Sequence, residues 1–142
     1  DVSGSPDDKT KSIAEIAITG CTIQHSANYS GSEKKTQALG GANIRLAGKK
    51  IYPINSVTIS GNVLSDTTTN VDISHSHDVT VSSNTFFAPK PSNLLVANSQ
   101  RVVVFEQASY ICVNKDLASS VATDSQYKSE EKQNKPGAPL HY

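Results

Sequence analysis

Two lines of sequence decide the fold of this chain. The first line is VTISGNVL at residues 57–64, followed by NVDISHS at residues 70–76. The second line repeats the first as VTVSSNTF at residues 79–86, followed by NLLVANS at residues 93–99. The two V-T segments are 22 residues apart and the two segments that begin with Asn are 23 residues apart. Self-similarity with a period of about 20–50 residues is typical of a protein built from stacked repeats.

Apolar and polar residues alternate within each line. The apolar pairs are Val57/Ile59, Val71/Ile73, Val79/Val81 and Leu94/Val96. Alternation places such residues on one side of a β-strand, whereas a parallel sheet covered on both faces has continuous apolar runs. Each repeat is therefore predicted to hold two strands that wind around a core and expose their outer face to solvent. The predicted fold is an all-β parallel β-helix, or solenoid, of three to four coils.

An earlier and less regular coil precedes the two lines. Residues 16–23 match residues 57–64, with Cys21 at the position of Asn62, and residues 41–46 match the first Asn segment. This coil is longer by about 13 residues within 24–40 and by about 5 residues around 49–53. Insertions in a repeat protein emerge as loops on one face, which is often the binding face.

The repeat pattern sets the expected domain boundaries. Residues 1–12 are predicted to be a polar lead-in, residues 13–114 the β-helix, and residues 115–142 a capping segment with a polar tail. Within the last part, apolar spacing over residues 116–127 and Asp116 at its start predict a short capped helix. Residues 111–113 are predicted to form one last strand before it.

Composition excludes several classes of function. Thirteen basic and thirteen acidic residues cancel among 142 residues, so there is no electrostatic case for binding nucleic acid or an anionic membrane. No apolar run is long enough to span a bilayer. Charged residues make up 18% of the chain, and Ser, Thr and Asn supply much of the polar surface, as is common in extracellular β-proteins. An extracellular or cell-surface location is therefore expected, with no cofactor and, because the acidic residues are scattered, no metal.

The chain resembles the right-handed parallel β-helix superfamily typified by pectin and pectate lyases. The resemblance rests on V-T-[IV]-S-[GS]-N at residues 57–62 and 79–84 and on N-[VL]-x-[IV] beginning at Asn70 and Asn93. It covers about residues 16–104 and implies a right-handed coil. Enzymes of this superfamily usually have more coils, and the chain begins at Asp1 and contains no Met, so we expect a fragment of a longer β-helix.

Two functions follow from the resemblance as expectations. The first is a carbohydrate-active β-helix that acts on a polysaccharide as a glycosidase, lyase or epimerase. The second is a non-catalytic β-helix that binds glycans or builds a surface assembly. A shared fold does not choose between them, so whether the chain is an enzyme stays open. The expected partners are a polysaccharide or oligosaccharide and either the remainder of the parent β-helix or a second copy of the chain.

Asp72 and His75 are the candidate catalytic residues. A carboxylate beside an imidazole can perform acid–base chemistry near neutral pH. His77 and Asp78 belong to the same titratable cluster. The resemblance weakens the hypothesis of a catalytic Asp72 and His75. Galacturonan-type hydrolases use several carboxylates and a Gly-His-Gly turn, whereas His75 lies between two serines. A solvated corner without catalytic function is the favoured alternative.

The candidate substrate-binding residues are Arg45, Lys49, Tyr29 and Tyr52. Arg45 and Asp72 occupy equivalent positions in consecutive coils, so their side chains should lie side by side on the outer surface and attract one another. Tyr29 and Tyr52 belong to the two insertions and could stack on sugar rings from the walls of a groove with Arg45 and Asp72 on its floor. Solvated lysines and packing tyrosines are the alternatives.

Four further expectations concern the register. Asn62 and Asn84 should form a ladder at equivalent corners, because Asn tolerates left-handed backbone and satisfies turn groups. Asn43, Asn70 and Asn93 should also align. Val103 and Phe105 should face outward and be buried against the tail or another chain. Cys21 and Cys112 should be too far apart for a disulfide.

Overall fold

The structure, a computed structural model, describes residues 2–3, 13–24, 42–67, 69–87, 92–108, 111–124 and 128–131. Regular structure in this part of the chain consists of β-strands, and it contains no helix. The strands are β1 (Val2–Ser3), β2 (Ala14–Thr19), β3 (Thr22–Gln24), β4 (Ile44–Ala47), β5 (Ile54–Ser60), β6 (Val63–Ser65), β7 (Thr69–Ser74), β8 (Ser76–Ser82), β9 (Thr85–Phe87), β10 (Ser92–Ala97), β11 (Gln100–Phe105), β12 (Ile111–Lys115), β13 (Val121–Thr123) and β14 (Lys128–Glu131).

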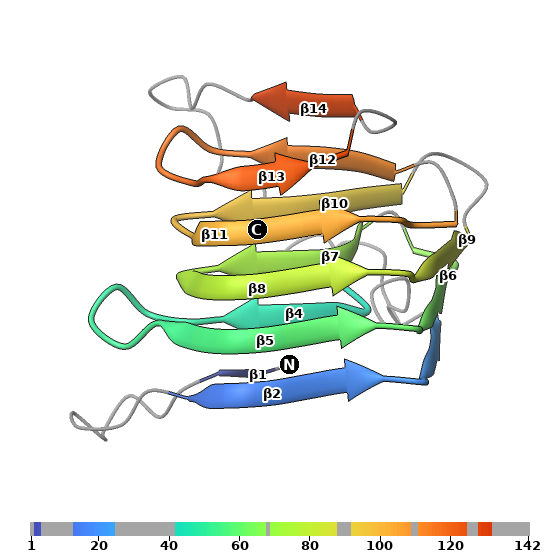
Figure 1. Ribbon diagram of the computed structural model, residues 1–142, viewed down its shortest axis with the longest axis horizontal. Helices are drawn as coiled ribbons and strands as arrows, with labels where there is room; N and C mark the ends of the chain where they lie inside the picture. The colour runs from blue at the N-terminus through green and yellow to red at the C-terminus, as the bar shows by residue number, and fades with distance from the viewer. Residues whose placement is uncertain are drawn as a thin grey trace, which may run out of the picture.

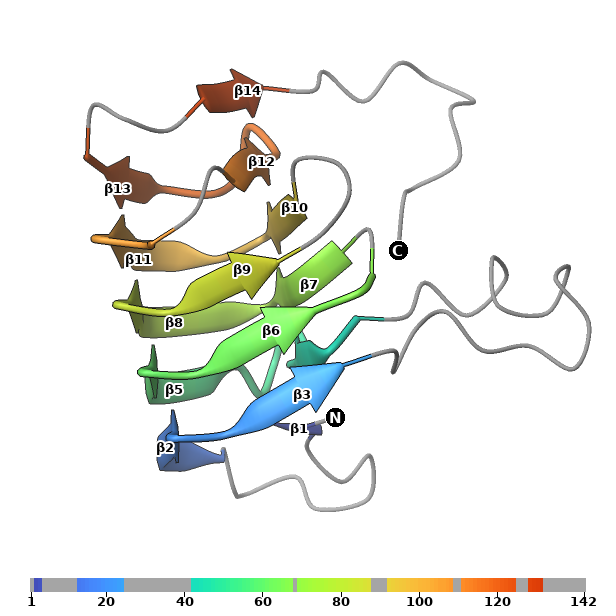
Figure 2. The ribbon, with the colours of Figure 1, turned by 90° about the vertical axis from the view of Figure 1, so that its right-hand side faces the viewer.

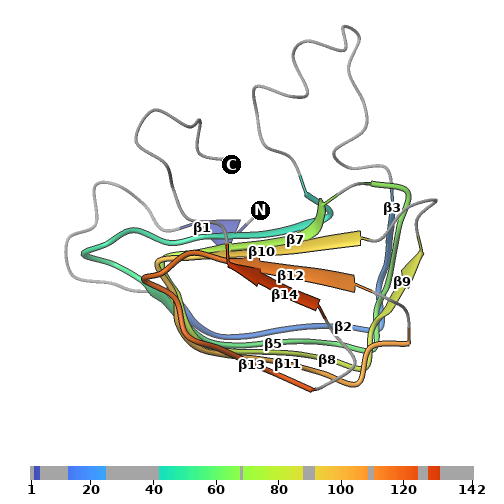
Figure 3. The same cartoon turned by 90° about the horizontal axis from the view of Figure 1, so that it is seen from above.

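The strands stack into three parallel sheets (Figures 1 and 2). Sheet A has the order β1-β4-β7-β10-β12-β14, sheet B the order β13-β11-β8-β5-β2, and sheet C the order β3-β6-β9. Viewed along the stack, sheets A and B form two long sides and sheet C closes a shorter third side (Figure 3). The prediction of an all-β parallel solenoid is therefore confirmed, with about three turns.

The coils that contribute to sheet C contain three strands where the sequence predicted two. After the corner at Gly61 and Asn62, the chain continues as the short strand β6, and β9 follows the equivalent corner at Ser83 and Asn84. These strands pair in parallel, with Val63 opposite Thr85 and Leu64 opposite Phe86. A strand of three residues gains its stability from this pairing, so its local sequence pattern is weak.

The alternating apolar residues form one continuous core. Leu46, Ile73 and Val96 are buried from sheet A, and Ile59, Val81 and Val104 are buried from sheet B. Leu64 and Phe86 close the core from sheet C.

Strand β7 departs from the expected solvent-exposed outer face, because residues 70–73 are all buried. Asp72, expected on an exposed surface, is therefore buried.

An amide ladder joins the corners between sheets B and C. Each rung follows a residue with positive φ, namely Gly20, Gly61, Ser83 and Glu106, a conformation that glycine adopts at little cost. The side-chain oxygen of Asn62 accepts a hydrogen bond from the Cys21 N–H, and that of Asn84 accepts one from the Asn62 N–H. The predicted Asn ladder is therefore confirmed, and Gln107 extends it by accepting from the Asn84 N–H at 2.9 Å.

A second ladder, made of serines, joins the corners between sheets A and B. The hydroxyl of Ser99 accepts a hydrogen bond from the Ser76 N–H at 3.0 Å, and the hydroxyl of Ser119 accepts one from the Ser99 N–H at 3.1 Å. His75 and Asn98, which precede two of these serines, have positive φ. This ladder was not among the features predicted from the sequence.

One register expectation needs correction. Asn43 and Asn70 align, and the Asn43 side-chain amide donates to the Asn70 side-chain oxygen at 2.6 Å. Asn93 instead lies opposite Thr69, because a β-bulge shifts the register between Asn93 and Leu94. The first alignment was right and the second was wrong.

The predicted helix at residues 116–127 is wrong in its described part. Ser119 donates to the backbone oxygen of Asp116 through its N–H and to the Asp116 carboxylate through its hydroxyl, which closes a turn. Val121–Thr123 then form β13, parallel to β11, and Val121 packs against the core. Pairing with an existing strand outweighs the weak tendency of so short a segment to form a helix. The expected last strand at residues 111–113 is present as β12.

Candidate functional site

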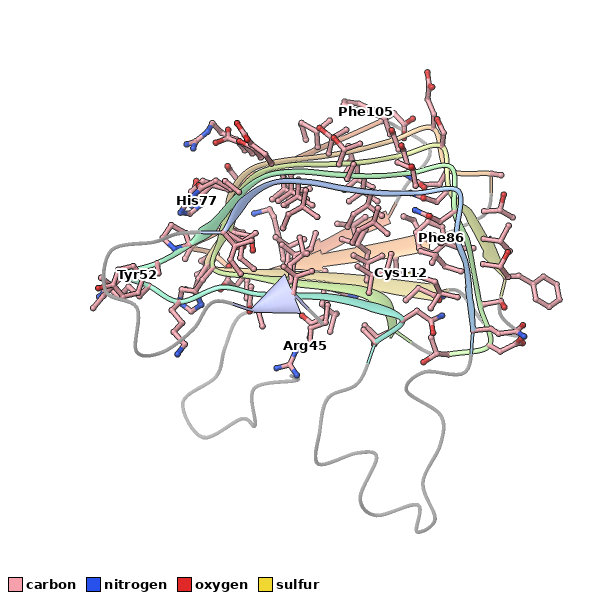
Figure 4. The ribbon with its side chains drawn as sticks, turned by 90° about the horizontal axis from the view of Figure 1, so that it is seen from below. Arg45, Tyr52, His77, Phe86, Phe105 and Cys112 are labelled. Atoms are coloured by element: carbon pink, nitrogen blue, oxygen red, sulfur yellow. The ribbon has the colours of Figure 1, made fainter. Side chains whose placement is uncertain are left out.

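Arg45 and Asp72 lie side by side on the outer face of sheet A. They are register partners on β4 and β7. The same row of register partners across sheet A continues to Leu95 on β10 and Asn114 on β12. Arg45 points out of the coil (Figure 4). The Arg45 Nε and the Asp72 Oδ2 are 4.0 Å apart, at the outer limit of a salt bridge, so the predicted charge pair is confirmed.

The Asp72 side chain is only 2% exposed although it faces outward. In its row it lies between Arg45 and Leu95, and the leucine offers no hydrogen bond. The Asp72 Oδ1 is buried and has no hydrogen-bond partner among the described residues. Burial raises the pKa of the Asp72 carboxyl to about 6, because it penalises the charged form, while the nearby Arg45 charge acts to lower it. The Asp72 carboxyl therefore changes its charge in mildly acidic solution.

Arg45 is the accessible member of this pair. One third of its side chain is exposed, and its contact with Asp72 is long. A guanidinium carries five N–H donors in a planar fork, so Arg45 can still bind an anionic group from solution.

Two other candidate binding residues, Lys49 and Tyr52, lie elsewhere on the coil. Lys49 and Tyr52 belong to the loop between β4 and β5, which is closed by a hydrogen bond from the Lys49 N–H to the Tyr52 backbone oxygen at 3.1 Å. Tyr52 lies at the corner between sheets A and B and is well separated from Arg45 (Figure 4). Tyr29 lies outside the described residues, so the opposite wall of the groove stays a prediction.

His75 occupies the corner that ends β7. Its N–H donates to the Ala97 backbone oxygen at 3.0 Å, and its backbone oxygen accepts from the Ile54 N–H at 3.1 Å. These bonds give His75 a structural function in the coil. Among the described residues, no hydrogen bond or ion pair joins the His75 ring to Asp72. The catalytic pairing of Asp72 with His75 therefore finds no direct contact to support it.

Asp78 and Arg101 form a second charge pair that the sequence analysis missed. The Arg101 Nε and Nη2 donate to the two Asp78 carboxylate oxygens at 2.5 and 2.9 Å. Both residues are exposed, and the hydrogen bond from Arg101 is the main cause that lowers the pKa of Asp78. The 23-residue spacing between them equals the repeat period and was the available signal. This pair is a natural control for Arg45 and Asp72, because it has the same chemistry without burial.

The described residues include no group of three or more His, Cys, Asp or Glu that could hold a metal ion. This part of the chain likewise has no helix with the length and hydropathy needed to cross a membrane. Comparison with protein-family models, curated proteins and solved structures found no match for the chain. The fold is a parallel β-solenoid.

Proposed function

We propose that the chain is an extracellular polysaccharide-binding β-solenoid that holds an acidic polysaccharide on the outer face of sheet A. The observation that carries this proposal is the partly exposed Arg45 guanidinium beside the buried Asp72 carboxyl. A guanidinium matches carboxylate and sulfate groups through two parallel hydrogen bonds. An outer face of parallel strands presents its side chains in straight rows, which suits an extended polymer.

Cleavage of the polysaccharide is the second candidate. It is favoured by the Asp72 carboxyl, whose pKa of about 6 suits a general acid that is protonated in mildly acidic solution. Glycosidases usually combine such an acid with a second carboxylate about 5–10 Å away. The described neighbours of Asp72 in its row are Arg45 and Leu95, neither of which is a carboxylate. Binding without cleavage is therefore the better-supported function.

The test compares three related polymers by calorimetric titration. Dextran is neutral, dextran sulfate carries sulfate groups, and polygalacturonate carries carboxylates. We expect one or both acidic polymers to bind, dextran not to bind, and Arg45→Ala to weaken binding at least tenfold. The control Arg101→Ala removes an exposed guanidinium of sheet B and should leave the affinity unchanged.

Equal losses in Arg45→Ala and Arg101→Ala would show unspecific charge attraction and contradict the proposed site. The same samples should be assayed for new reducing ends and for unsaturated products. Their appearance in the wild-type chain and loss in Asp72→Asn would establish the second candidate.

A further inference from the structure

Arg45 and Asp72 differ sharply in their access to water. The guanidinium is one third exposed, whereas the carboxyl is almost completely buried. The contact of 4.0 Å is long, and no hydrogen-bond partner for the Asp72 Oδ1 lies in the part of the chain that the structure describes. An ionised carboxylate in this position is poorly solvated and only partly compensated by its partner.

The other described neighbours of Asp72, in its row and on its face of β7, carry no charge. Leu95 of β10 is apolar. On the same face of β7, Asn70 accepts a hydrogen bond from Asn43, and the Ser74 hydroxyl donates to the Leu46 backbone oxygen. Arg45 of β4 is thus the charged group that faces Asp72 from the described strands on either side. His75 is the nearest other titratable residue along the chain.

We propose that Asp72 is a proton-operated gate for Arg45: an anionic group of the ligand binds Arg45 when Asp72 is protonated and is released when Asp72 ionises. This inference rests on the proposed function, because it assigns a regulation to the same site. It requires that proton binding at Asp72 and anion binding at Arg45 favour one another.

The physical reason is competition for a single guanidinium. When Asp72 is ionised, its negative charge partly neutralises Arg45 and repels an incoming anion. When Asp72 is protonated, Arg45 keeps its full positive charge and the new carboxyl O–H can itself donate a hydrogen bond. Because the pKa of Asp72 is raised to about 6, the change falls in mildly acidic solution.

The first experiment needs no polysaccharide. Coupling between two sites is reciprocal, so an anion bound at Arg45 must raise the pKa of Asp72. The Asp72 carboxyl carbon should be followed by NMR through a pH titration in sodium sulfate and in sodium chloride of equal ionic strength. We expect sulfate to raise the pKa, and Arg45→Gln to abolish the rise while Arg101→Gln retains it. An Asp72 pKa that is the same in both salts would overturn the gate.

The second experiment measures dextran sulfate binding at pH 5 and pH 7.5, where the charge of this polymer is constant. The wild-type chain should bind about tenfold more tightly at pH 5, which corresponds to a modest coupling between sites. Asp72→Asn mimics the protonated acid and should bind tightly at both values. Asp78→Asn and His75→Gln are controls that should retain the pH dependence.

The two experiments separate the gate from the function. Arg45-dependent binding of equal strength at both pH values would refute the gate and leave the proposed function standing. A sulfate-induced rise in the Asp72 pKa without any polysaccharide binding would support the gate and refute the function. Loss of the pH dependence in His75→Gln alone would assign the proton to His75 and overturn the proposal.

Discussion

The side-chain oxygen of Asn84 accepts two hydrogen bonds from Asn62 on the neighbouring coil. The Asn62 N–H donates at 3.1 Å and the Asn62 side-chain amide donates at 3.0 Å. The Asn84 amide in turn donates to the Ile59 backbone oxygen at 3.1 Å. Because Asn84 is 0% exposed, water cannot replace these bonds if the side chain is removed.

Asn84→Ala should therefore lower the free energy of unfolding by about 3 kcal/mol, since it leaves buried donors and an acceptor unsatisfied. Urea unfolding followed by circular dichroism measures the loss. Thr85→Ser, at the exposed next position, is the control and should change the stability little. If both variants unfold at the same urea concentration, the ladder does not stabilise the solenoid as we argue.

Gly48→Ala should destabilise the coil for a different reason. A Cβ at Gly48 would lie 1.9 Å from the His75 backbone oxygen and 2.8 Å from the His75 carbonyl carbon. Both atoms belong to a backbone held by hydrogen bonds between coils, so a loss of about 3 kcal/mol is expected. Gly61→Ala is the comparison: its Cβ would meet no atom within 4 Å, but its positive φ should still cost about 1 kcal/mol. A smaller loss in Gly48→Ala than in Gly61→Ala would be inconsistent with the close approach.

Stability should also depend on the ionisation of Asp72. Its pKa is about 6 in the folded chain and near the ordinary 3.8 when unfolded, so the folded chain binds more protons between these values. Stability contributed by this group is therefore present below about pH 4 and is lost as the pH rises through 6, by about 3 kcal/mol in total.

Urea unfolding of the wild type and of Asp72→Asn at pH 4 and pH 7 tests this dependence. Relative to the wild type, the free energy of unfolding of Asp72→Asn should be higher at pH 7 than at pH 4. Relative to the wild type, the free energy of unfolding of Asp78→Asn should be lower at pH 7 than at pH 4. The pKa of Asp78 is lowered in the folded chain, so the stability that its carboxylate contributes is lost on acidification. A constant difference between wild type and Asp72→Asn would show that the carboxyl is not desolvated.

Both cysteines should remain free thiols in solution. Cys21 lies at the corner of the first coil and Cys112 lies on β12, and neither forms a disulfide. Three coil steps at strand spacing separate them by about 14 Å along the axis, beyond the roughly 7 Å between Cα atoms that a disulfide allows. Mass spectrometry without reductant should find no crosslink. Detection of a Cys21–Cys112 peptide would contradict the order of the coils.

The fold could be predicted from the sequence because its signals are local and repeated. Alternation at Val57/Ile59 and Val79/Val81 reports which side of a strand faces the core. The period of 22 to 23 residues places equivalent positions on neighbouring coils. The ladder from Asn62 to Asn84 followed from that period, and the pairing of Arg45 with Asp72 followed from matching residues 41–46 with the segment that begins at Asn70.

What only the tertiary structure decided depends on groups that are distant in the sequence. Val121 joins β13 rather than a helix because β11 offers it a parallel partner. Gln107 becomes a rung of the ladder because the Asn84 N–H faces it from the preceding coil. Alternation correctly placed Asp72 outside the core, but its burial depends on side chains from neighbouring coils, which no pattern within one strand records.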